Sequence, residues 1–416
     1  MRNFSAEAYE VPILEQRFLW RRMFIVNDPA GIKRIYLDNV ENYTKTPVAR
    51  RLLEPALGRG LLTMHGEEWR RHRRIVAPSF DHQNIVGNAP IMTEVAEDLA
   101  AAWGRLAPDA TIDMVREMMQ ATLRIIARTM FSTEPDGIAE AIARSVQQYQ
   151  KRMRPTALDL LGLSQWIPWR RKERAVQRGF GETNRAMERL IAERRAAPDI
   201  GRIDLLSRLI AARDEDGAPL TPKEIRDHVV TFFMAGHETT SVALSWTWYL
   251  LSQHPDAEAK LHHELDTVLG GRTPTYADIA ALPYTRMVIE EAMRLYPPAH
   301  TMSRQSQGED MIAGQRIRKG TVVLIVPWVL HRHRRLWDRP EVFEPERFAP
   351  DRVHQRQHPP YLAVRWLRSR NRQHPRTPAA GVGGETNFTR LLRRKPGPFR
   401  AGRKPIPSFG PCSGPR

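Results

Sequence analysis

The stretch from Val229 to Leu251 is apolar at most positions and long enough to span a lipid bilayer. Its centre, however, holds the run AGHETT at residues 235–240, and an acidic side chain at that depth would be costly in lipid. We therefore interpret the stretch as a long helix that is buried inside a folded protein. Because a mid-helix glycine and clustered polar groups need room and partners, we predict a local distortion at residues 236–239.

Two interpretations of this polar run follow from its residues. In the first, the hydroxyl groups bond to carbonyl oxygens of the helix itself, and the run is only a structural kink. In the second, the helix lies against a bound cofactor. The small residues Ala235 and Gly236 would then let a flat molecule approach the backbone, and the hydroxyl of Thr239 would bond to a ligand held there.

The elements predicted around this helix describe a mostly α, α+β protein. A capping box of Thr221 and Glu224, with Pro222 in the first turn, marks the start of the long helix. Alternating apolar residues predict strands between residues 311 and 325, and residues 23–26 form another short strand candidate. Apolar residues recur at helical spacing over residues 91–130 and 138–153. Further helices are predicted over residues 28–37, 67–76, 170–195, 255–269 and 284–295.

Most of the positive charge lies in the C-terminal tail. The formal charge is +17, and residues 363–416 contribute +12 of it, because thirteen Lys and Arg residues face only one acidic residue, Glu385. Residues 1–362 therefore carry only +5. The tail is rich in Arg, Pro and Gly without periodicity, a composition typical of disorder. It lacks interleaved aromatic residues and a folded scaffold, so we expect no nucleic-acid partner.

Cysteine content and the N-terminus indicate the compartment. Cys412 is the only cysteine, so no intramolecular disulfide can form. Residues 1–10 lack the apolar segment and the cleavage site of a secretory signal. Together with the buried long helix, these features predict a cytoplasmic protein without a membrane span.

Three further motifs place charged side chains at defined spacing. Glu291 and Arg294 share a helix face in the run EAMR, Arg347 lies in the run FEPERF, and Trp69 precedes Arg73 by one helical turn. Each has an ordinary explanation: a surface ion pair worth less than about 1 kcal/mol, a loop with flanking aromatic residues, or a solvated basic face. No one of these motifs identifies a function alone.

In this order and spacing, AGHETT, EAMR, FEPERF and the Trp69–Arg73 pair resemble the cytochrome P450 family over about residues 23–362. The resemblance implies the fold of that family, a single large helical domain with a small β-rich lobe. It implies haem b as the cofactor and O2 as a substrate. The implied activity is that of a monooxygenase, which inserts one oxygen atom into a lipophilic small molecule with electrons from a ferredoxin or flavin reductase, and we expect a monomer.

The resemblance also assigns roles to individual residues. The long helix would cross the distal face of the haem, with Ala235 and Gly236 beside the cofactor. Thr239 would hydrogen-bond to bound oxygen, and Glu238 would take part in proton delivery. A buried charge triad would lock the proximal side through Glu291, Arg294 and Arg347. The haem propionates would be held by side chains whose N–H groups suit carboxylates, namely Trp69, Arg73 and Arg304.

Candidates for a substrate pocket follow from their place near these motifs. They are Phe232, Phe233, His300, Thr301 and Met302. For Phe232 and Phe233, ordinary packing in the hydrophobic core is an equally good explanation.

The chain departs from the family pattern after Leu362. In the family, a loop with the haem-ligand cysteine follows the FEPERF-type element, whereas residues 363–366 here read AVRW. One set of codons for these four residues, read one base later, encodes Pro-Phe-Gly-Gly, which opens that loop, but this frame does not restore the cysteine. We therefore divide the chain into a P450-like domain, residues 1–362, and a basic tail, residues 363–416, that is either disordered or frame-shifted.

The iron ligand consequently has no assigned residue. Cys412 lies in the run SFGPCSG, but it follows Phe348 by 64 residues and lacks the arginine of the ligand loop. His374 would offer a neutral imidazole, which gives globin-like or peroxidase-like electronics. We expect this chain to form no competent haem–thiolate centre, and the alternative function is a defective remnant that binds haem weakly or not at all.

Overall fold

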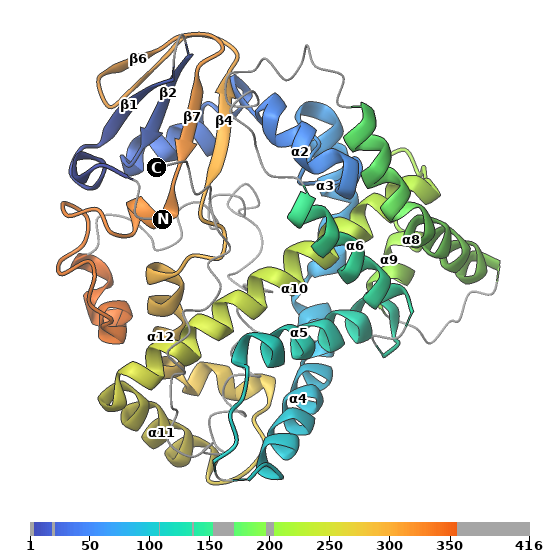
Figure 1. Ribbon diagram of the computed structural model, residues 1–416, viewed down its shortest axis with the longest axis vertical. Coiled ribbons are helices and arrows are strands. Elements are labelled where there is room, and N and C mark those ends of the chain that lie inside the picture. Colours follow the sequence, from blue (N-terminus) through green and yellow to red (C-terminus); the bar gives the residue numbers. More distant parts are fainter. Residues whose placement is uncertain are drawn as a thin grey trace.

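The computed structural model describes residues 4–18, 21–107, 109–134, 137–152, 170–196 and 204–355. The predictions for the tail at 363–416, for the run at 363–366, for His374 and for Cys412 lie outside the described residues. Within them, a small sheet lies at one side of a broad helical body (Figure 1). The predicted mostly α, α+β class is confirmed.

The central helix, α10, extends from Pro222 to Gln253 and runs diagonally through the helical body (Figure 1). It begins as a capping box: Thr221 Oγ1 accepts a hydrogen bond from Glu224 N at 3.2 Å, and the Glu224 carboxylate accepts one from Thr221 N at 2.7 Å. The helix is interior to the protein. No helix in the described part of the chain is apolar enough over a sufficient length to cross a membrane.

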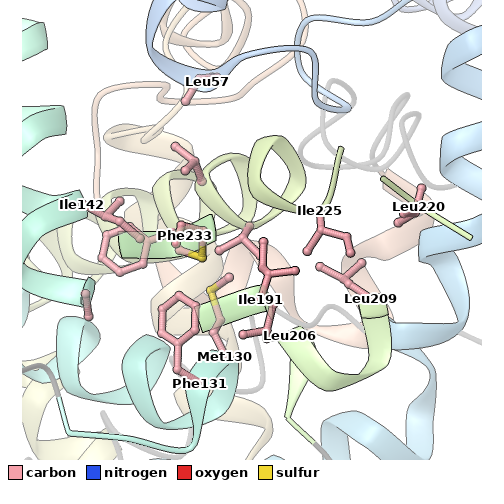
Figure 2. Packing of buried hydrophobic residues seen from close by; sticks show 14 of the residues in the cluster. Leu57, Met130, Phe131, Ile142, Ile191, Leu206, Leu209, Leu220, Ile225 and Phe233 are labelled. Carbon is pink, nitrogen blue, oxygen red and sulfur yellow. The ribbon is translucent and has the colours of Figure 1, made fainter. Parts of the chain in front are cut away.

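The N-terminal half of α10 packs into the larger hydrophobic core, which Figure 2 shows from close by. Phe233 of α10 joins Met130 and Phe131 there, and each of the three side chains is at most 2% exposed. Removing that much apolar surface from water is the main stabilising term of the fold. The helices around this core include α5 (Met114–Phe131), α6 (Ile138–Arg152), α8 (Arg170–Ala196) and α9 (Leu205–Ala211), and the ends of two shorter helices at residues 56–57 and 75–76 also reach it.

The C-terminal half of α10 packs into a second core with Leu244 and Trp248. The partner helices are α4 (His82–Gly104), α11 (Pro255–Leu269) and α12 (Pro283–Leu295). The helical spacing predicted over residues 91–130 falls on two helices, α4 and α5. They are separate because α5 has its own N-cap, where the Asp113 carboxylate accepts a hydrogen bond from Arg116 N at 3.1 Å.

The sheet has the strand order β1-β2-β7-β4-β3, in which β2 and β7 are parallel and the other pairs antiparallel. A separate hairpin of β5 and β6 turns at Ala313 and Gly314, both with positive φ. The strands predicted at residues 23–26 and 311–325 are thereby confirmed. The strands are β1 (Ile13–Phe18), β2 (Arg21–Val26), β3 (Tyr43–Thr44), β4 (Met302–Ser306), β5 (Asp310–Ile312), β6 (Gln315–Ile317) and β7 (Val322–Ile325).

Shorter elements connect the sheet to the helical body. Two of them matter for the candidate site: α2 (Pro47–Leu57) and α3 (Gly66–Val76), which follow β3 directly. The others are α1 (Pro29–Lys33), the π-helix Arg34–Asp38, α13 (Pro327–Leu330) and the 3-10 helices Ala6–Tyr9, Val40–Asn42, Ala77–Phe80, Tyr276–Ala281, Pro345–Phe348 and Pro350–Gln355.

Candidate functional site

Three charged side chains meet between α12 and the 3-10 helix Pro345–Phe348. Arg294 donates from Nε and Nη2 to the two carboxylate oxygens of Glu291, at 2.7 and 2.8 Å, which makes a bidentate pair. Arg347 Nε lies 3.4 Å from Glu291 Oε1. Glu291 and Arg294 are completely buried, and Arg347 is 8% exposed. The structure thus brings the predicted triad together in the protein interior.

The triad also anchors an irregular segment of backbone. Arg294 Nη1 donates to the carbonyl oxygens of His331 and Pro340 at 2.8 and 2.7 Å, and Nη2 donates to that of Val342 at 3.1 Å. Buried carbonyl groups outside helices and strands must find such donors elsewhere. The guanidinium carbon also lies 5.1 Å from the ring centroid of Trp337. Arg347 adds hydrogen bonds to the carbonyl oxygens of Asp338 and Arg339, so two buried arginines hold the meander between residues 331 and 342.

The polar run of α10 stays helical, which corrects the predicted distortion at residues 236–239. The α-helix is continuous from Pro222 to Gln253. Thr239 Oγ1 donates to the carbonyl oxygen of Ala235, and Ser241 Oγ donates to that of Glu238 at 2.9 Å. Hydroxyl groups that bond one turn back satisfy themselves locally, so the helix does not have to open. Glu238 and Thr239 are half-buried, and Ala235 is exposed.

Gly236 faces the neighbouring helix α5. A Cβ atom at this position would lie 2.7 Å from Ile126 Cδ1, closer than an ordinary van der Waals contact. The glycine therefore lets α5 approach α10 closely. The missing side chain at 236 thus leaves room for Ile126, and the exposed Ala235 next to it has the small surface that the cofactor interpretation needs.

His237, which the motif analysis left without a role, ties α10 to α5. Its side chain is buried, and Nδ1 lies 2.9 Å from Thr122 Oγ1, which also donates to the carbonyl oxygen of Met118 at 2.8 Å. Burial lowers the pKa of His237 to about 4, so the ring is neutral at pH 7. The sequence places His237 next to Glu238 in the polar run, but the motif alone does not show that the histidine side chain is buried.

A stripe of three side chains runs along α3. His65 is the residue before the helix, and Trp69 and Arg73 follow at successive steps of four, so the three share one face. The guanidinium carbon of Arg73 lies 5.6 Å from the ring centroid of Trp69, a cation–π distance. Burial lowers the pKa of Arg73. The predicted pair is therefore in contact, and His65 extends it by one turn.

Strand pairing brings a second set of basic residues to this stripe. Tyr43 and Thr44 of β3 pair with Ser306 and Gln305 of β4, and this register carries Lys45 toward Arg304. Just beyond the ladder, Thr46 Oγ1 lies 2.9 Å from Ser303 Oγ. Arg304 itself donates to the carbonyl oxygen of Ser303 at 2.8 Å and lies 4.8 Å from the ring centroid of Tyr36.

Lys45 holds the loop that leads into α3. Its ammonium donates to the carbonyl oxygens of Leu61 and Met64, each at 2.6 Å. Burial, together with the positive charges of Arg304 and Arg50, lowers the pKa of Lys45 to about 7. Burial and the charges of Arg50 and Lys45 likewise lower the pKa of His65. We call Lys45, Arg50, His65 and Arg304 the cationic cluster.

The same loop is fixed to α10 on its other side. Arg59 N donates to Asp227 Oδ2 at 2.8 Å, and Gly60 lies so close that an added Cβ would overlap Thr231 Oγ1. Thr231 precedes Ala235 by one helical turn. The loop that Lys45 holds is therefore docked on α10 about one turn before the polar run.

The cationic cluster fits a cofactor that carries carboxylates. The pKa values of Lys45 and His65 are both lowered, mainly by burial and then by the positive charges beside them. Arg50 Nε is buried without a hydrogen-bond partner within the described ranges. Guanidinium, ammonium and imidazole donors are the groups that proteins use for carboxylates. Lys45 and His65 were missed because only strand register and helix spacing, not a motif, place them here.

The predicted pocket residues divide into two groups. Phe233 is 1% exposed and belongs to the hydrophobic core (Figure 2), which corrects its assignment to a pocket. Phe232 is half-buried, with its ring centroid 4.9 Å from that of Phe80 and stacked on His228. Met302 is half-buried at the start of β4, and His300 and Thr301 just before it are exposed.

Comparison with solved structures matches this architecture. The crystal structure of the haem domain of cytochrome P450DA superimposes with a TM-score of 0.76 at 25% sequence identity, covering 92% of this chain and 83% of that one. The fold and the arrangement of the charged residues therefore define a P450-type haem domain.

Comparison of sequences leads to the same class. The model of the cytochrome P450 family matches residues 4–363. Cyclooctatin synthase from Streptomyces melanosporofaciens is 36% identical over 82% of this chain and 74% of its own length. Cyclooctat-9-en-7-ol 5-monooxygenase from the same organism is 35% identical over 82% and 73%, and pentalenene oxygenase from Streptomyces avermitilis is 34% identical over 71% and 65%. The chain belongs to the cytochrome P450 family, whose members are haem-dependent oxidoreductases.

Proposed function

We propose that this chain is descended from, and folds as, a monooxygenase that binds haem b between the cationic cluster and the polar run of α10. The observation that carries the proposal is the cluster itself: four basic side chains gathered beside a helix whose exposed Ala235 leaves room for a flat molecule. The propionate groups of haem would supply carboxylates for these basic side chains to bind. Lys45, Arg50, His65 and Arg304 would hold them, together with Trp69 and Arg73 on α3.

The residues of α10 would serve the reaction on the other face of the cofactor. Haem, when bound, supplies the iron at which O2 is activated. The Thr239 hydroxyl already bonds to Ala235 O, and a small rotation about its side chain would let it donate toward a ligand instead. Glu238, one position earlier and half-buried, would pass protons to that hydroxyl.

The relatives support a lipophilic small molecule as the substrate. Their names refer to cyclooctatin, cyclooctat-9-en-7-ol and pentalenene. We propose a substrate of this apolar kind, electrons from a ferredoxin or flavin reductase, and a monomeric protein in the cytoplasm. Phe232, half-buried one turn before Gly236, remains a candidate for contact with such a substrate. Residues 1–362 would form the catalytic domain and residues 363–416 a separate tail.

A second candidate function is a defective remnant of this enzyme. The observation that favours it is the cysteine content: Cys412 is the only cysteine of the chain and lies far from the family position of the ligand. Haem–thiolate chemistry requires an anionic sulfur on the iron, and neither Arg nor Trp near residue 363 can supply one. Such a protein would bind haem weakly through its propionates or not at all.

Reconstitution of the full chain with haemin tests the site and separates the two candidates. We expect binding at one haemin per chain, weakened at least tenfold by Lys45→Gln or Arg304→Gln. Arg316→Gln, at an exposed arginine of β6 that pairs with Glu309, is the matched control. Equal affinity in all variants would overturn the proposed cofactor site.

The carbon monoxide spectrum of the reduced protein then reports the iron ligand. A thiolate-type red-shifted Soret band that disappears in Cys412→Ser would support the monooxygenase and identify its ligand. A histidine-type band, or no stable complex, would support the remnant.

A further inference from the structure

Two buried histidines join α3 to α10 outside the groups that the proposed chemistry uses. His72 and His228 are 1% and 0% exposed, and His72 Nδ1 lies 2.8 Å from His228 Nε2. The other nitrogen of His72, Nε2, lies 3.2 Å from Glu224 Oε1. The three side chains form a polar chain from the start of α10 into the interior.

The partners fix where the protons sit. Glu224 also accepts a hydrogen bond from Thr221 N and is a carboxylate, so His72 Nε2 must donate to it. His72 Nδ1 is then a lone pair when the ring is neutral, and it accepts from His228 Nε2–H. His228 Nδ1 is left as a buried lone pair, with no hydrogen-bond partner in the described part of the chain. Both rings are therefore neutral in this arrangement.

Burial disfavours an additional proton on the pair and outweighs the attraction of the nearby carboxylates. From α3, the charged groups near the pair are Arg71, itself bonded to Asp214, and Glu68. Arg59 lies in the preceding loop, and Glu224 is the acid from α10. Phe232 stacks on His228 with ring centroids 5.9 Å apart. Burial lowers the pKa of both histidines, that of His228 to about 4.

Protonation would oppose the bond between the rings. A proton on His72 Nδ1 would point at the proton on His228 Nε2 across 2.8 Å. To accept from protonated His72, His228 would have to carry its own proton on Nδ1 instead of Nε2. This buried N–H donor would have no hydrogen-bond partner among the described residues, and its cost weakens the contact between α3 and α10 when the pair is protonated.

We infer that the His72–His228 hydrogen bond is a proton-sensitive joint, in which the two histidines act as positioning residues that hold α3 against α10. His72 adjoins Arg73 on α3, and α10 carries the polar run two to three turns beyond His228. The joint therefore sets the distance between the two sides of the candidate haem site. The link to haem rests on the proposed function, whereas the joint itself does not.

Two substitutions at position 228 distinguish the effect of losing the hydrogen bond from the effect of protonating it. In His228→Gln, the amide can donate to neutral His72 and, after rotation, accept from the protonated ring, so the joint persists at both protonation states. In His228→Phe, the stacking on Phe232 is kept but the bond is lost. His263→Gln, at an exposed histidine of α11, is the matched control.

Amide hydrogen exchange of α3 in the haem-free full chain, corrected for the intrinsic exchange rate at each pH, is the readout. Between pH 7.5 and 5.5, we expect protection of residues 66–76 to fall about tenfold in the unsubstituted protein and in His263→Gln. We expect no such fall in His228→Gln, and low protection at both pH values in His228→Phe. The same pH dependence in His228→Gln as in the unsubstituted protein would overturn the joint. Because no haem is present, failure of the haem site leaves this outcome unchanged.

Discussion

Arg347 reaches Glu291 across fifty-six positions of the chain, with Nε 3.4 Å from Oε1 inside the protein. The same carboxylate oxygen accepts a hydrogen bond from Glu344 N at 3.0 Å. One buried acid therefore joins α12 to the 3-10 helix Pro345–Phe348, and the meander between them is held in place by Arg294. The packing of α12, the meander and the 3-10 helix Pro345–Phe348 therefore depends on a few buried charges.

Removing the acid of this triad is expected to be strongly destabilising. Glu291→Gln leaves the fully buried Arg294 without its carboxylate, and breaking a buried pair in this way costs about 3–5 kcal/mol. Glu140→Gln is the control, because its contact with Arg144 is an exposed i,i+4 pair, worth about 0.5 kcal/mol. Urea unfolding measures both. Equal midpoints for the two variants would contradict the structural role of the triad.

Acidification is expected to destabilise the protein through His237. Its pKa is about 4 in the folded protein and about 6.5 when unfolded, so the unfolded chain binds more protons between these values. The stabilisation is complete above pH 6.5 and is lost as the pH falls toward 4, by up to about 3 kcal/mol. His237→Gln, which can still bond to Thr122, should show a shallower decline of the free energy of unfolding. A decline as steep as in the parent would show that other groups cause it.

Haemin affinity is expected to fall as the pH rises above 7. Lys45 has a pKa of about 7 beside Arg304 and Arg50, and only its charged form attracts a propionate. If the bound carboxylate keeps Lys45 protonated, affinity decreases by up to about tenfold per pH unit above 7. A Soret titration from pH 6 to 9 measures this. Lys45→Arg, whose charge persists throughout, should flatten the profile, and an unchanged slope in that variant would exclude Lys45 as the cause.

Two glycine substitutions should act in opposite directions. In Gly60→Ala, the new methyl group would overlap Thr231 Oγ1 and lie 2.9 Å from Asp227 O, so the loop must move away from α10, at a cost of about 1–3 kcal/mol. In Gly87→Ala, no atom of another described segment lies within 4 Å of the new methyl group on α4, and the higher helix propensity should add about 0.5–1 kcal/mol. Thermal unfolding compares the two. A stabilising Gly60→Ala would mean that the loop is not docked as described.

Much of the local structure could be predicted from patterns that extend over a few residues. The capping box at Thr221 and Glu224 marked the start of α10, and the i,i+3 spacing of Glu291 and Arg294 placed both charges on one helix face. The spacing of Trp69 and Arg73 did the same on α3. These features are readable because helix geometry relates sequence distance directly to distance in space.

The predicted distortion of α10 was wrong for a reason that is also local. A polar group in a buried helix has two ways to be satisfied, by opening the helix or by bonding one turn back, and residue types alone do not choose between them. Thr239 and Ser241 take the second way. Gly236 likewise has a role in packing that depends on the neighbouring Ile126 rather than on its own motif.

The sequence by itself determined the family, the helices and the charged motifs of this protein, because each rests on neighbouring residues. Only the tertiary structure decided that Lys45 and Arg304 share a cluster and that His72 bonds to His228, whereas the contact between Glu291 and Arg347 was implied by the family resemblance alone. These contacts join segments far apart in the chain. Their formation depends on strand register and on how helices dock, where the burial of many side chains, and not any single spacing, sets which groups meet.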